Sequence, residues 1–231
     1  MVQLVIAWPH VAARGRSDFL VSDCNRAALG WVERWPDWPG HALVVHGPPG
    51  SGKSHLAHVW RERSGARLVG PAELTAGSAP EIAAGGRPVA VDDADQVPER
   101  DLLHLYNWCG ERGLCLLILA RLSPAAWPIG LLDLASRLRA AQIVGIAPPD
   151  DALLGAVLVK HFADRQLRVA PGLVAYLVRR MERSFAAAAS LAARLDEAAL
   201  ASRAAVNIPL ARRILAEVEA QSSAPSSLGV T

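Results

Sequence analysis

The chain has little of several features that would indicate a protein class directly. It contains only three cysteines in 231 residues, and the spacing of Cys24, Cys109 and Cys115 suits neither a metal site nor, being odd in number, a full disulfide framework. We interpret them as reduced, mostly buried thiols. The formal net charge is only +2, which gives no electrostatic reason to expect the protein to wrap nucleic acid.

Long apolar runs are also absent. The richest run, at 114–120, has the length of a strand and is too short to span a bilayer. The amino terminus lacks a basic region followed by an apolar stretch, so no signal peptide is predicted. These absences predict a soluble, cytoplasmic protein without a membrane partner.

What the sequence does contain is an alternation of apolar strands and helices over its first two thirds. Amphipathic or alanine-rich helices are predicted at 23–34, where Ser22 is the expected cap, at 53–64 and at 99–112. Buried strands alternating with helices indicate a parallel sheet that is covered on both faces. The predicted strands are 42–46, 67–69, 88–91, 114–119 and 142–146.

After Pro148 and Pro149 the pattern changes to helices only, at 151–165, 171–182, 184–202 and 209–220. The predicted architecture is therefore an α/β lobe with a parallel sheet, followed by a small all-helical lobe. The predicted parts are a flexible segment at 1–15, the α/β lobe at 16–147, the helical lobe at 148–220 and a disordered tail at 221–231.

The strongest motif is Gly47-Pro48-Pro49-Gly50-Ser51-Gly52-Lys53-Ser54, which fits the P-loop pattern with an apolar strand before it and a helix after it. Its glycines let backbone amides point at phosphate oxygens. Lys53 supplies positive charge near the β and γ phosphates, and Ser54 offers a hydroxyl to Mg²⁺. The motif predicts an AAA+ type site for ADP or ATP, and the sequence does not choose between the two nucleotides.

Asp92 and Asp93 follow the strand predicted at 88–91, as a Walker B motif requires. Asp92 is predicted to hold Mg²⁺ through water, because this ion keeps much of its hydration shell. Asp93 stands where most AAA+ ATPases carry a glutamate that activates the attacking water. The alternative is a solvated acidic turn that includes Asp95. Since aspartate is shorter than glutamate, we expect weak or no intrinsic ATPase activity.

The segment Leu131-Leu132-Asp133-Leu134-Ala135-Ser136-Arg137-Leu138 resembles box VII of the bacterial replication initiator DnaA and, more closely, of its shorter relative Hda. The resemblance also covers His46-Gly47, the P-loop, Ser54-His55-Leu56, the Walker B strand and 148–214. It implies an AAA+ regulator that, with the DNA-loaded sliding clamp, stimulates hydrolysis of DnaA-bound ATP and so inhibits replication initiation. It makes Arg137 the arginine finger and adds His55 to the nucleotide site. The alternative for Arg137 is a helix-end arginine that neutralises the helix dipole.

Two stretches depart from the DnaA pattern. The polar sensor 1 residue that the DnaA pattern has after the Walker B strand is missing at 119–124. Either Arg121 substitutes for this residue, or the sensor 1 contact is lost. Ala186 stands where the sensor 2 arginine is usual. Arg183 lies three residues earlier, nearly one helical turn away, and either reaches the phosphates or is a solvated surface residue.

The first residues, Gln3-Leu4-Val5-Ile6, resemble the short peptide by which Hda attaches to the sliding clamp, the beta subunit of DNA polymerase III. The alternative is a frayed terminus. If the clamp interpretation holds, the protein meets DNA only indirectly.

Three other functions stay open at this stage. They are a self-sufficient AAA+ ATPase such as a helicase loader, a small-molecule P-loop kinase, and a DNA-binding transcription factor. Asp93 and the missing sensor residues count against the first, and the absence of an arginine-rich lid counts against the second. The third is disfavoured because nothing in the chain matches the helix-turn-helix domain of DnaA. Self-association into a homodimer is not decided by the sequence.

Overall fold

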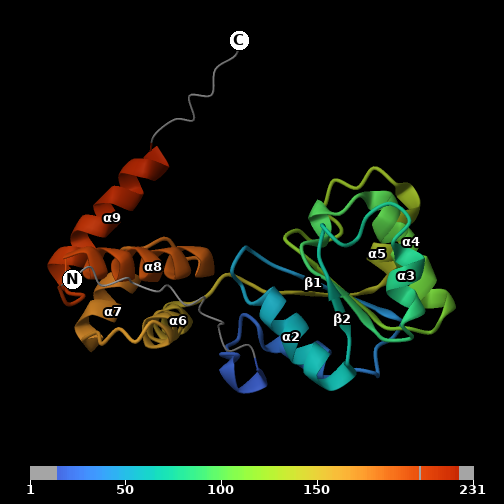
Figure 1. The fold of residues 1–231 in the computed structure, drawn as a ribbon, viewed down its shortest axis with the longest axis horizontal. Helices are drawn as coiled ribbons and strands as arrows, with labels where there is room; N and C mark the ends of the chain where they lie inside the picture. The colour runs from blue at the N-terminus through green and yellow to red at the C-terminus, as the bar shows by residue number, and fades with distance from the viewer. Residues whose placement is uncertain (1–14, 203, 224–231) are drawn as a thin grey trace, which may run out of the picture. The chain divides into compact units, whose positions relative to one another are not determined.

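The computed structural model describes residues 15–202 and 204–223, which form two compact units (Figure 1). The first, here called the α/β unit, covers 15–149, and the second, the helical unit, contains the described residues from Asp150 onward. The predicted fold class, a parallel-sheet lobe followed by a helical lobe, is confirmed. Among the described residues, every helix is too short or too polar to span a bilayer.

The α/β unit is built on a five-stranded parallel sheet with the order β2-β3-β4-β1-β5. The central strands consist almost entirely of buried apolar residues, as expected for strands with both faces covered. The strand order brings the carboxyl ends of β3, β4 and β1 side by side at one edge of the sheet. The strands are β1 (Ala42–His46), β2 (Arg67–Val69), β3 (Val89–Val91), β4 (Leu116–Ala120) and β5 (Gln142–Gly145).

Helices cover the two faces of the sheet, and alternate strand residues contact each layer (Figure 1). Leu43 and Val45 pack with buried residues of α1 (Arg26–Glu33) and α2 (Lys53–Ser64), including Trp60. Val44 and Ile118 face the other way, towards α3 (Ala79–Ala84), α4 (Glu99–Glu111) and α5 (Leu132–Ala140). Two single-turn helices, η1 (Arg16–Asp18) and η2 (Ala94–Gln96), complete the unit.

The helical unit contains α6 (Asp151–Asp164), α7 (Pro171–Val178), α8 (Phe185–Ser202) and α9 (Ile208–Ser223). Its core is separate from that of the α/β unit and includes Leu158, Phe162, Leu177 and Leu195, which are at most 1% exposed. The Asp150 side chain caps α6 by accepting a hydrogen bond of 2.7 Å from the backbone N–H of Leu153.

Several element boundaries differ from those predicted. The helix expected at 23–34 begins at Arg26, and the prediction that Ser22 caps it is wrong. The N-cap position is taken by Asn25, whose Oδ1 accepts a hydrogen bond from the Ser22 backbone N–H and whose amide donates to the Leu20 carbonyl. This side chain therefore fixes the turn before the helix. The strand expected at 114–119 begins at Leu116 and ends at Ala120.

The three cysteines are free thiols. Cys109 is fully buried in the core of the α/β unit, and burial raises its pKa to about 12. Because only the thiolate reacts readily, this residue is an inert part of the packing.

Candidate nucleotide-binding site

The P-loop leaves the end of β1 and is fixed there by tight packing. The Gly47 backbone N–H donates to the carbonyl of Ala120 at the end of β4. A Cβ atom at Gly47 would lie only 2.9 Å from the Ile146 carbonyl oxygen, and one at Gly52 would lie 3.1 Å from the Phe19 ring. Gly52 also has a φ of 91°. Glycine is thus required at Gly47 by close packing and at Gly52 by backbone conformation as well.

Substitution of Gly47 tests this packing. We expect Gly47→Ala to lower the free energy of unfolding by about 1–3 kcal/mol, because backbone and side-chain atoms must shift to admit the methyl group. Chemical denaturation of the protein without added nucleotide measures the loss. Gly40→Ala is the matched control, since no atom lies within 4 Å of its added Cβ. Equal stability of the two variants would contradict the account.

Lys53 carries the positive charge of the loop. It is only 6% exposed, and its Nζ donates to the carbonyl oxygens of Gly47 (2.8 Å) and Pro48 (2.9 Å). Burial lowers the pKa of Lys53, the charges of the acidic residues after β3 raise it, and the Arg121 charge lowers it. The buried Ser51 hydroxyl has no hydrogen-bond partner within the described residues. The loop therefore concentrates a cation and an unused donor in a small volume.

Ser54 and Asp92 line one cavity of about 260 Å³, together with His58, Glu73 and residues of β2 and β3. A hydroxyl and a carboxylate are oxygen ligands of the kind that Mg²⁺ prefers. Within the described ranges, no group of three or more His, Cys, Asp or Glu side chains is arranged to hold a metal ion. This sparse donor set fits an ion that keeps most of its waters and takes other ligands from nucleotide phosphates.

Asp93 and Asp95 meet Arg121 beyond the ends of β3 and β4. Asp93 has a left-handed backbone with φ of 46°, and its backbone N–H donates to the Asp92 carboxylate. The Arg121 guanidinium lies 3.6 Å from Asp93 and 3.8 Å from Asp95, and the Arg121 backbone N–H donates to Asp95 Oδ1 at 3.1 Å. The two aspartates therefore do not form a purely solvated acidic turn.

Arg137 lies at the opposite end of the α/β unit from the P-loop. It lines a cavity of about 280 Å³ with His41, which precedes β1, and with Tyr106 and Glu111 from α4. The P-loop follows β1, and a five-residue strand spans about 15 Å. Burial lowers the pKa of His41, and the nearby Arg137 charge lowers it further. Arg137 is consequently remote from the P-loop of its own chain.

The Arg137 side chain is 40% exposed and is held loosely. Its Nε lies 3.1 Å from Asp133 on the preceding turn of α5, and its guanidinium carbon lies 5.9 Å from the centre of the Tyr106 ring. An exposed pair of this spacing contributes only about 0.3–0.5 kcal/mol. The guanidinium can therefore leave its partners at little cost.

Comparisons with known proteins give one family match and several similar folds. The family model described as "Hda, lid domain" matches residues 151–215. The helical unit of this chain is therefore similar to the lid domain of Hda. Solved structures share its fold: domain III of the Thermotoga maritima replication initiation protein DnaA has a TM-score of 0.75 at 14% identity, covering 88% of this chain and 96% of that one. A sequence comparison with curated proteins finds no match.

Two further solved structures are similar in fold. AMPPCP-bound DnaA from Aquifex aeolicus has a TM-score of 0.59 at 15% identity, covering 72% of this chain and 60% of that one. The Thermotoga maritima RuvB Holliday junction branch migration motor has a TM-score of 0.69 at 15% identity, covering 90% of this chain and 73% of that one. At these identities, the likeness establishes the fold alone.

The Hda-type lid contains the other predicted nucleotide contact, Arg183. Its guanidinium lies 3.1 Å from Asp151 within the helical unit and is 70% exposed. A contact between Arg183 and phosphate stays a prediction, as does a nucleotide contact of His55. The His55 ring nitrogen Nε2 lies 2.8 Å from the Gly15 carbonyl oxygen, and the ring packs edge-on against Phe19.

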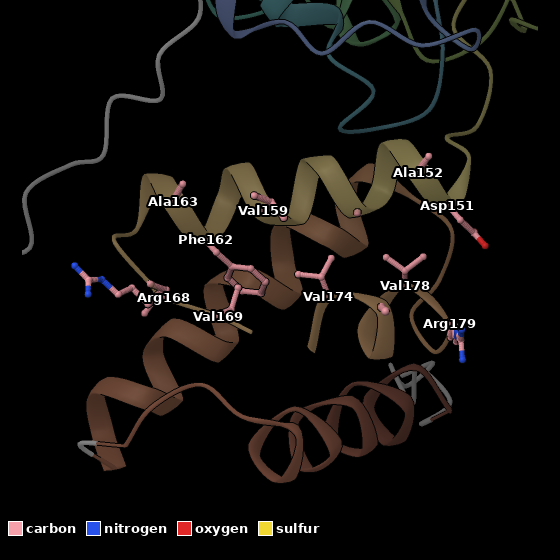
Figure 2. Close-up of a pocket in the computed structure, with 13 residues that line it drawn as sticks. Asp151, Ala152, Val159, Phe162, Ala163, Arg168, Val169, Val174, Val178 and Arg179 are labelled. Carbon is pink, nitrogen blue, oxygen red and sulfur yellow. The ribbon is translucent and has the colours of Figure 1, made fainter. Parts of the chain in front are cut away.

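The lid also has an apolar cavity of about 870 Å³ between α6 and α7. Figure 2 shows Phe162 from α6 and Val174 and Val178 from α7 pointing towards one another, with the guanidinium groups of Arg168 and Arg179 extending away.

The predicted clamp-binding residues Gln3, Leu4, Val5 and Ile6 lie outside the described residues.

The role of Asp95 was not predicted from the sequence. Asp95 was considered only as part of an alternative acidic turn, whereas its carboxylate is 10% exposed and accepts the backbone N–H of Arg121. The available signal was a pair of opposite charges at the ends of two strands, 26 residues apart, which become neighbours only through the sheet order.

Proposed function

We propose that this chain is a negative regulator of chromosomal replication initiation. It binds ADP or ATP with Mg²⁺ and, together with the DNA-loaded sliding clamp, stimulates hydrolysis of the ATP held by DnaA. Arg137 is the group that acts on this ATP, by stabilising the charge that develops on the γ-phosphate. The nucleotide bound by the chain itself has a mainly conformational role.

The observation that carries this proposal is the position of Arg137. Arg137 is half exposed and loosely held, and the length of β1 separates it from the P-loop of its own chain. These features suit an arginine that acts on a nucleotide bound by another subunit. The Hda-type lid and the fold shared with DnaA support DnaA as the partner. The fold also accounts for the proposed adenine nucleotide, because one of the similar DnaA structures is AMPPCP-bound.

Reconstitution tests the proposal as a whole. DnaA loaded with labelled ATP is incubated with clamp on nicked DNA, with and without this protein, and the conversion of bound ATP to ADP is followed over time. Acceleration that needs both the protein and the DNA-loaded clamp is the expected result. Equal rates with and without the protein would contradict the regulatory function.

The clamp-binding segment is tested by a triple substitution of Gln3, Leu4 and Ile6 to alanine. Removing the amide and two aliphatic side chains that would enter a preformed groove should weaken clamp binding at least about tenfold. Surface plasmon resonance on immobilised clamp measures the affinity, and ADP binding should be unchanged. His10→Ala with Val11→Ala is the control outside the motif. Clamp affinity that the triple substitution leaves intact would discard the assignment.

A further inference from the structure

The helix that carries Arg137 is not capped by a residue of its own. The N-cap position of α5 is Leu131, and no side-chain hydrogen bond caps the helix there. A leucine side chain has no acceptor to offer to backbone N–H groups. Any polar anchor at the start of α5 therefore has to come from another element.

Glu99, in the first turn of α4, supplies this anchor. One of its carboxylate oxygens accepts the backbone N–H of Gly130 at 2.9 Å, and the other accepts that of Leu131 at 2.7 Å. Hydrogen bonds to a charged acceptor are roughly twice as strong as neutral ones, and a pair of them also fixes orientation. Glu99 is itself partly buried. It therefore fixes where, and in which direction, the chain enters α5.

The same helix, α4, also contacts Arg137 near the other end of α5. The Tyr106 ring lies 5.9 Å from the guanidinium carbon, and the two helices lie side by side (Figure 1). Between these points, Leu134 and Leu138 of α5 pack into the core of the α/β unit. Apolar packing is non-directional, so it fixes the position of a helix along its own axis less sharply than hydrogen bonds do. The two bonds to Glu99 supply that restraint.

The distance from this anchor to Arg137 is short. Arg137 follows Leu131 by six positions, which is about 9 Å along the helix axis. Because a hydrogen-bonded helix of this length moves as a unit, a shift at its start is passed on to Arg137. A displacement of about 1 Å in a reacting group can lower a rate by about 100-fold. The position of the start of α5 therefore matters for a catalytic arginine.

We propose that Glu99 is a positioning residue for Arg137, which acts by fixing the start of the helix that presents the guanidinium. The inference rests on the proposed function, in which Arg137 acts on ATP held by DnaA. The guanidinium itself is loosely held by Asp133, whereas the backbone that carries it is anchored from α4. The side chain can thus reach outward from a fixed base.

The first test examines the anchor in the full chain without a partner. Glu99→Ala should speed amide hydrogen exchange in peptides that cover 128–137 by about tenfold, because two hydrogen bonds are lost. Exchange in β4 should be unchanged, and circular dichroism establishes that the variant is folded. Glu81→Ala is the control, since it removes an exposed acid from the first turn of α3. Unaltered exchange in Glu99→Ala would overturn the proposal.

The second test follows single-turnover hydrolysis of labelled ATP on DnaA with clamp-loaded DNA. Glu99→Ala should lower the maximal stimulated rate by about 10- to 100-fold and leave the half-saturating concentration almost unchanged. Glu99→Gln keeps one acceptor oxygen, so its maximal rate should lie between those of Glu99→Ala and the unaltered chain. A full maximal rate in Glu99→Ala would show that the anchor is merely structural, and the positioning role would be rejected.

A double variant shows whether Glu99 acts through Arg137. Adding Glu99→Ala to Arg137→Ala should lower the rate no further, because the group that Glu99 positions is then absent. A further loss of about tenfold would mean that Glu99 acts by another route, which would also reject the proposal. Failure of the proposed function is distinguishable, because the unaltered chain then gives no stimulation. The positioning role falls with it in that case, while the exchange result still reports the anchor.

Discussion

An Arg137→Ala variant should lose about 10³-fold or more of the stimulated rate of DnaA-bound ATP hydrolysis, the size of the arginine-finger effect in GTPases. The loss is expected because the guanidinium stabilises negative charge that develops on the γ-phosphate only in the transition state. Its removal should therefore lower the rate of hydrolysis far more than the affinity for DnaA. Among the described residues, this side chain pairs with Asp133 and lies beside the Tyr106 ring. The substitution should therefore leave folding almost unchanged.

The measurement is single-turnover hydrolysis of labelled ATP on DnaA with clamp-loaded DNA, over a range of regulator concentrations. The maximal rate should fall while the half-saturating concentration changes little. Arg139→Ala is the matched control, because it removes the same charge from the same last turn of α5 at an exposed position. A variant at Arg137 that still gives the full maximal rate would exclude the finger, whatever happens to affinity.

The position of Arg137 also explains why one part of the site was predictable and another was not. The sequence suggested a helix-end position for Arg137, and the structure has it in the last turn of α5 (Leu132–Ala140). Its separation from the P-loop depends on the strand order, which places α5 over one face of the sheet and His41 at the start of β1. No local pattern in the sequence predicts the separation between Arg137 and the P-loop.

The α/β fold could be predicted because its strands are short apolar runs whose neighbours are turn-forming or charged residues. The helix α3 (Ala79–Ala84) was missed, since six residues with a proline and little periodicity give no helical signal. The Ser22 cap was predicted wrongly, because a serine before an apolar stretch is a local signal that the Asn25 side chain overrides through its own backbone hydrogen bonds.

The P-loop residues were assigned from the motif alone, whereas the contacts of Arg121 were not. The motif is a contiguous eight-residue pattern whose chemistry is almost independent of the rest of the chain. The pairs of Arg121 with Asp93 and Asp95 join residues more than 20 positions apart and depend on β3 and β4 being neighbours. The sequence left open whether Arg121 substitutes for a sensor residue, and the observed contacts make that question testable.

A Lys53→Met variant should bind ADP at least about 100-fold more weakly, because it removes a cation that is expected to make charge-assisted contacts with the phosphates. Methionine is chosen because it keeps an unbranched chain in a position that is only 6% exposed, so that loss of charge is separated from loss of volume. The carbonyl oxygens of Gly47 and Pro48 lose their donor in this variant, which should add to the loss by loosening the loop.

Calorimetric titration with ADP gives the affinity, and circular dichroism of the protein without nucleotide establishes that the variant is folded. Lys160→Met is the control, since Lys160 is the only other lysine of the chain and belongs to the helical unit. If Lys53→Met binds ADP within about threefold of the unaltered chain, the P-loop does not hold the phosphates. Because the proposed conformational role needs a bound nucleotide, the same variant should also stimulate DnaA poorly at ADP concentrations that saturate the control.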